Sequence, residues 1–118
     1  MENLRNFARI FKSMGDPIRL SILRVISKKP ICVSMIASEL KITNPLASHH
    51  LKILEREELV TRQKEGVRVR YQLNKEGMDK FIIRIYKYLG IEMELENIPK
   101  FLKTIKNVGD FLTESPKL

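Results

Sequence analysis

Only residues 41–43 separate two helical patterns in the stretch SMIASELKITNPLASHHLKIL. We predict that the first helix begins at Ser34 and that Thr43 is the N-cap of the second, because hydroxyl side chains accept hydrogen bonds from the free amides of a first turn. The expected apolar stripe of the second helix consists of Ala47, Leu51 and Leu54. A connection this short predicts a tight helix-turn-helix.

The segments on either side predict a mostly helical α+β domain. Apolar residues at helical spacing favour helices over 3–14 and from Pro17 onward, with Asp16 as the cap of the second. The β-branched run ICV could pair briefly as a strand, and VRVRYQL alternates apolar and polar residues as a half-buried strand does. Gly66 suits a tight hairpin between this strand and one beginning at Val60. A helix after Asn74 completes the pattern. The predicted fold is a winged helix-turn-helix with a two-stranded β-wing, followed by an additional C-terminal helix.

The charge balance favours an anionic partner. The chain has 22 Lys and Arg against 14 Asp and Glu, a formal net charge of +8. Because neutralising phosphates releases counterions, this excess favours nucleic acid, with anionic lipid second. No stretch approaches the roughly 18 unbroken apolar residues of a membrane span, and the first residues lack the layout of a signal peptide. We therefore expect a cytoplasmic protein without a membrane partner.

The second helix of the turn has a polar side that can contact DNA. The N-terminal residues of such a helix meet base edges in the major groove. Asn44, Ser48 and His49 carry groups that can bond to bases, whereas Thr43 and Lys52 suit phosphates. The predicted ribbon adds cations that would lie along the backbone or enter the minor groove. The predicted DNA-binding residues are Thr43, Asn44, Pro45, Ser48, His49, Lys52, Arg62, Lys64, Arg68 and Arg70.

Three blocks of the sequence carry a family resemblance. SMGDPIRLSIL, ICVSMIASEL and ASHHLKILEREELVTRQKEGVRVRYQL resemble the ArsR (ArsR/SmtB) family of transcription regulators, over residues 4–90. The resemblance implies a sequence-specific DNA-binding regulator, a repressor, that acts as a homodimer on a pseudopalindromic operator in double-stranded DNA. One departure is Lys41, where the family commonly has glycine, which puts the turn geometry in question.

The resemblance also implies a dimer interface on the first helix and the helix after the wing. Both helices carry more apolar surface than a small domain can bury, which is typical of an interaction surface. The predicted interface residues are Leu4, Phe7, Phe11, Ile82, Ile85, Tyr86 and Leu89. We expect residues 1–91 to form the winged helix-turn-helix DNA-binding domain. Residues 92–118 would be a C-terminal helical extension packed on the dimer.

The metal sites known in this family are incomplete in the sequence. One uses a paired-cysteine motif resembling Cys-Val-Cys, and here the block contains Cys32 and Ser34. A hydroxyl is a poor ligand for soft metals, so we interpret Ser34 as an N-cap and Cys32 as a small core residue. The other site uses Asp and His after the wing, and here Asp79 is present but Phe81 stands where the nearby His would be.

The two histidines do not form a metal pair either. His49 and His50 point about 100° apart on a helix, so they cannot bind one ion together. We expect His49 to face outward and His50 to be half-buried and structural. The sequence therefore predicts no metal and no cofactor, and one cysteine with two such histidines predicts no enzyme.

Two alternatives remain open at this stage. The chain could be a winged-helix protein-interaction scaffold without specific DNA binding. It could also be a DNA-binding sensor with a non-standard trigger, either oxidation of Cys32 or a metal held by Glu92, Glu94 or Asp79.

Overall fold

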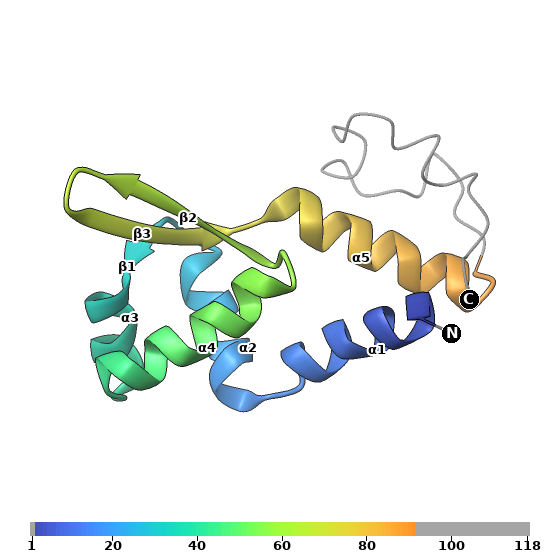
Figure 1. The fold of residues 1–118 in the computed structure, drawn as a ribbon, viewed down its shortest axis with the longest axis horizontal. Coiled ribbons are helices and arrows are strands. Elements are labelled where there is room, and N and C mark those ends of the chain that lie inside the picture. Colours follow the sequence, from blue (N-terminus) through green and yellow to red (C-terminus); the bar gives the residue numbers. More distant parts are fainter. Residues whose placement is uncertain (1, 92–118) are drawn as a thin grey trace. The chain divides into compact units, whose positions relative to one another are not determined.

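The fold is a mostly helical winged helix-turn-helix, as predicted (Figure 1). The computed structural model describes residues 2–91, and the chain divides into two compact units, Met1–Asn74 and Lys75–Leu118. The elements of the first unit are α1 (Glu2–Met14), α2 (Pro17–Ile26), β1 (Ile31–Cys32), α3 (Val33–Leu40), α4 (Asn44–Arg56), β2 (Val60–Glu65) and β3 (Arg68–Leu73). The second unit contains α5 (Lys75–Tyr88), and residues 92–118, the predicted extension, lie outside the described residues.

Side-chain caps fix where two of the helices begin. Asp16 Oδ1 accepts hydrogen bonds from the amides of Ile18 and Arg19, at 2.9 and 3.1 Å, and Pro17 follows in the first turn. Thr43 Oγ1 accepts from the Leu46 amide at 3.2 Å, as predicted. The prediction for α3 was wrong, because Cys32 occupies the N-cap position and Val33 already belongs to the helix.

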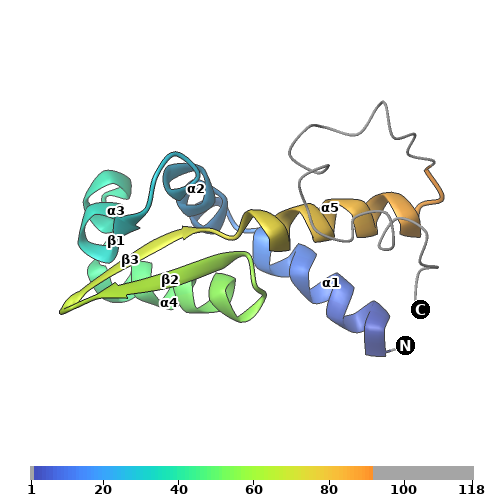
Figure 2. The same ribbon diagram turned by 90° about the horizontal axis from the view of Figure 1, so that it is seen from above.

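A three-stranded antiparallel sheet in the order β1-β3-β2 forms the wing and its base (Figure 2). The short strand β1 pairs through Ile31 with Tyr71 and through Cys32 with Arg70. The hairpin pairs Val60 with Leu73 at its base and Glu65 with Arg68 at its tip. The sheet thus anchors the hairpin to the segment just before the helix-turn-helix.

The core of the first unit lies between its helices and the base of the hairpin. Its fully buried side chains come from α2, α3, α4, β2 and the turn before β2, and are Ile22, Ile26, Ile36, Leu51, Leu54, Leu59 and Val60. Ala47, Leu51 and Leu54 form the buried stripe of α4, as predicted. The apolar side chains of Leu20 in α2 and Met35 in α3 are exposed, because each of these helices packs through one side only.

The turn between α3 and α4 depends on a left-handed residue. Lys41 has φ 56° and ψ 44°, a conformation in which a side chain costs energy and glycine does not. The amide of Ile42 bonds to the carbonyl of Ala37 at 2.9 Å, which closes the end of α3. The turn therefore forms without the glycine that the resemblance led us to expect.

We predict that Lys41→Gly stabilises the chain, because it removes this strain. The free energy of unfolding should rise by about 1 kcal/mol in urea titrations. Lys12→Gly, which removes an exposed lysine from inside α1, should lower it by up to about 1 kcal/mol. If both substitutions destabilise the chain, Lys41 makes a compensating contact that outweighs the strain.

The second unit is described through α5 and Ile91. Phe81 and Ile83 are its buried apolar side chains, whereas Ile82 and Ile85 are partly exposed. Asp79 is also buried, and this burial raises the pKa of its carboxyl. Lys80 and Glu76 form an ion pair at 3.1 Å on the exposed side of α5.

Candidate nucleic-acid interface

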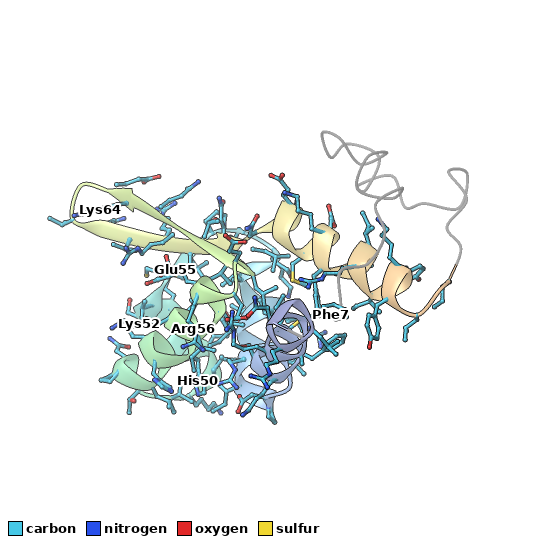
Figure 3. The ribbon with its side chains drawn as sticks, turned by 45° about the vertical axis from the view of Figure 1, so that its right-hand side comes forward. Phe7, His50, Lys52, Glu55, Arg56 and Lys64 are labelled. Atoms are coloured by element: carbon cyan, nitrogen blue, oxygen red, sulfur yellow. The ribbon has the colours of Figure 1, made fainter. Side chains whose placement is uncertain are left out.

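The polar side of α4 is accessible along most of its length. The exposed residues on this side are Asn44, Pro45, His49 and Lys52, and Ser48 is partly exposed. The apolar stripe on the opposite side, which includes Ala47, is buried. Figure 3 shows Lys52 on the outer side of the helix. The hydroxyl oxygen of the exposed Thr43 accepts from the Leu46 amide, and its O–H can still donate to a phosphate. The predicted helix residues therefore lie on one accessible surface, which we call the α4 surface.

The hairpin does not present its four cations on one side. Residues directly paired across an antiparallel hairpin point to the same face of the sheet, and successive residues alternate. Arg62 pairs with Tyr71 and Lys64 with Val69, whereas Arg70 pairs with Gln63 and Arg68 with Glu65. The four cations therefore form two basic surfaces, one with Arg62 and Lys64 and the other with Arg68 and Arg70.

The surface with Arg62 and Lys64 continues the α4 surface. Arg62 Nε lies 3.6 Å from the Glu55 carboxylate of α4, and both side chains remain partly exposed. Glu55 lies seven residues after Ser48, on the same side of the helix. In Figure 3, Lys64 lies near the far end of the hairpin. A line of polar groups thus runs from α4 onto the wing.

The tip of the hairpin carries a residue that the sequence analysis missed. The loop consists of Gly66 and Val67, since Glu65 and Arg68 are the last pair. Gly66 has φ +60°, which a tight two-residue turn requires, and the side chain of Val67 is 100% exposed. Proteins that bind the minor groove frequently insert apolar side chains between base steps, and Val67 is an exposed apolar side chain at the tip of a basic hairpin. The two residues between the strands, Gly66 and Val67, were the sequence signal that could have placed Val67 at the tip.

The comparisons with known proteins agree with this geometry. Residues 16–62 match the family model described as "Bacterial regulatory protein, arsR family". An HTH-type transcriptional regulator of Methanocaldococcus jannaschii is 45% identical over 67 residues, which are 56% of this chain and 75% of that protein. The arsenical resistance operon repressor of Staphylococcus xylosus is 37% identical over 75 residues, 64% of this chain and 72% of the repressor. The chain belongs to the ArsR family.

A solved structure related to this ArsR-family chain supports the same fold. It is the homodimeric winged helix-turn-helix DNA-binding domain of a possible ArsR-family transcriptional regulator from Mycobacterium bovis. The similarity covers 77% of this chain and 84% of that chain, with 25% identity and a TM-score of 0.62. The matched relatives are named as transcription regulators and not as enzymes.

The cysteine of this ArsR-family chain is not a core residue, contrary to the prediction. Cys32 is half-buried, and its Sγ lies 3.3 Å from the Ser34 hydroxyl. That hydrogen bond lowers the pKa of the thiol from its usual value. Cys32 lines a surface hollow of about 740 Å³ together with Met35, Arg68 and Arg70. Within residues 2–91, no three His, Cys, Asp or Glu side chains gather as a metal site would require.

The predicted dimer residues differ in how much surface they offer. Phe11, Tyr86 and Leu89 are exposed, and Leu4, Ile82 and Ile85 are partly exposed. Phe7 is only 5% exposed and contacts the Phe11 ring edge to face, so its own ring offers little surface to a partner. Tyr88 and Ile91 are exposed apolar residues that the prediction did not include.

None of the helices described between residues 2 and 91 is long and apolar enough to cross a membrane.

Proposed function

We propose that this ArsR-family chain is a transcription regulator, a repressor, that binds operator DNA through α4 and the wing. The observation that carries the proposal is the accessible α4 surface, with Ser48, His49 and Lys52, beside a hairpin that holds four cations. Groups at the N-terminal part of α4 would contact base edges, and the cations would contact phosphates. One relative is named as an operon repressor and another, from Bacillus subtilis, as a transcriptional repressor. These names support repression, rather than activation, as the role of this chain.

The two basic surfaces favour entry of the wing into the minor groove over contact with one backbone. A hairpin that enters a groove edge-on brings each of its faces toward a different phosphate strand. Arg62 and Lys64 would then contact one strand and Arg68 and Arg70 the other, with Val67 between them. A hairpin lying flat along one backbone would use the cations of one face only.

We further propose that two copies act together. A related domain is named as homodimeric, and the exposed Phe11, Tyr86 and Leu89 supply apolar surface of the kind that a partner copy covers. A twofold dimer would present two α4 helices to the half-sites of a pseudopalindromic operator. The partner of the dimer would be double-stranded DNA. We expect the protein to act in the cytoplasm, with no catalytic role and no cofactor.

The test begins with operator selection from genomic fragments. Ser48→Ala and His49→Ala should each weaken binding to a selected duplex by about tenfold, while binding to scrambled DNA changes little, because only base contacts are lost. Ser38→Ala, at an exposed position on α3, is the matched control. Mobility shifts at fixed salt give both affinities.

Two results would contradict the proposal. Equal losses on selected and scrambled DNA would show that the two residues do not contact bases. A pure protein that shifts no duplex at low salt, yet purifies with another protein at a fixed ratio, would favour the interaction-scaffold alternative.

A further inference from the structure

Arg19 connects three parts of the first unit that are distant in sequence. Its guanidinium Nε donates to the carbonyl of Ser13 at the end of α1, and Nη1 lies 3.0 Å from Nδ1 of His50 in α4. Its backbone amide donates to Asp16, which holds Arg19 in the first turn of α2. One side chain therefore joins the α1–α2 region directly to the middle of the DNA-contacting helix.

The Arg19–His50 contact requires a neutral histidine. An arginine guanidinium can only donate, so Nδ1 of His50 accepts and the ring proton is on Nε2. His50 is 7% exposed, in contrast to the exposed His49 beside it. The charged groups that act on His50 are Asp16 from the α1–α2 turn, Arg19 from α2 and His49 from α4 itself. Burial lowers the pKa of His50, opposed by Asp16, so the ring is neutral at pH 7.5.

Apart from this bond, the polar side-chain contacts of α4 lie near its two ends, and the packing around His50 has little direction. The inner stripe of Ala47, Leu51 and Leu54 is apolar, and apolar contacts tolerate small rotations of a helix about its axis. A hydrogen bond loses strength steeply when its angle changes, so the Arg19–His50 bond opposes such rotations. Ser48 and His49 directly precede His50, so their directions follow the same rotation.

We propose that Arg19 is a positioning residue for DNA recognition, which acts through His50 to fix the rotation of α4 and the directions of Ser48 and His49. This inference rests on the proposed function. Base contacts need a placement accurate to about 0.5 Å, whereas contacts of a mobile cation with phosphates do not. Loss of the bond should therefore reduce binding to the operator more than binding to scrambled DNA.

Operator binding should also depend on pH through His50. Protonation of His50 turns Nδ1 into a donor that faces the Arg19 cation, so operator binding should weaken as the pH falls below 6.5, the ordinary histidine value. His50→Asn places an uncharged amide oxygen near the position of Nδ1, and His49→Asn removes the other imidazole.

The experiment uses the full chain with its selected operator and a scrambled duplex, at pH 7.5 and 5.5. Arg19→Gln should weaken operator binding by about tenfold at pH 7.5 with little change on scrambled DNA. Arg24→Gln, at an exposed arginine of the same helix, loses the same charge and should leave the ratio of the two affinities unchanged. His50→Asn should keep binding at pH 7.5 and lose the acid-induced weakening, whereas His49→Asn should keep that weakening.

Equal effects of Arg19→Gln and Arg24→Gln would overturn the inference, as would a His50→Asn chain with the wild-type pH profile. The pH comparison remains decisive even if Arg19→Gln fails to fold, because it needs only the two histidine variants. A wild-type chain that binds no DNA at pH 7.5 would instead refute the proposed function, and the role of Arg19 with it.

Discussion

Replacing Arg68 and Arg70 together with alanine is expected to weaken binding to every double-stranded DNA by at least about tenfold at moderate salt. Each phosphate contact contributes about 0.9 to the slope of log affinity against log salt, so the slope should fall by about 2. Both side chains lie on the same face of the hairpin, away from the Glu55 carboxylate that partly neutralises Arg62. Anisotropy titrations over a series of KCl concentrations measure both quantities.

The matched variant is Arg62→Ala with Lys64→Ala, which removes the same charge from the opposite face. Entry into the minor groove predicts a lower slope for both double variants, because each face would contact a different phosphate strand. Contact with a single backbone predicts that only one pair lowers the slope. If neither pair does, the wing does not touch DNA.

The hairpin illustrates what the sequence could and could not predict. Alternation in VRVRYQL identified β3 correctly, because one of its faces packs on the core. The segment TRQKE of β2 is polar at every position, so it has no alternation that fixes its register. The register depends on the two-residue loop at Gly66, and only the structure assigns each cation to a face.

Local signals also explain the success and failure at the helix starts. Asp16 and Thr43 cap through their own side chains, a relation between neighbours that a sequence displays directly. Cys32 precedes α3 because β1 pairs with β3, which is about forty residues away in sequence. The exposure of Met35 and the bond from Arg19 to His50 are likewise set by distant parts of the chain, so no local pattern could indicate them.

A buried carboxylate at the end of α4 gives the second large expected effect. The side chain of Glu57 is 1% exposed, and the Arg9 guanidinium of α1 lies 2.9 and 3.2 Å from its two oxygens. Arg56 contributes a weaker contact at 3.5 Å. Removal of one partner from a buried pair leaves a charge without compensation, which typically costs about 3–5 kcal/mol. Because Arg9 is 55% exposed and Arg56 remains, Arg9→Ala should lower the free energy of unfolding by about 2–3 kcal/mol.

Urea unfolding at one protein concentration measures this effect, since dimer formation would make stability depend on concentration. Arg5→Ala removes another exposed arginine from α1 and should change stability by less than about 0.5 kcal/mol. Glu57→Gln should cost less in the Arg9→Ala background than in the wild type, because the unpaired charge is then absent. Equal costs in both backgrounds would mean that the two side chains do not stabilise one another. A measured coupling would show that α1, on which the proposed dimer contacts lie, is energetically tied to the end of α4 from which the wing begins.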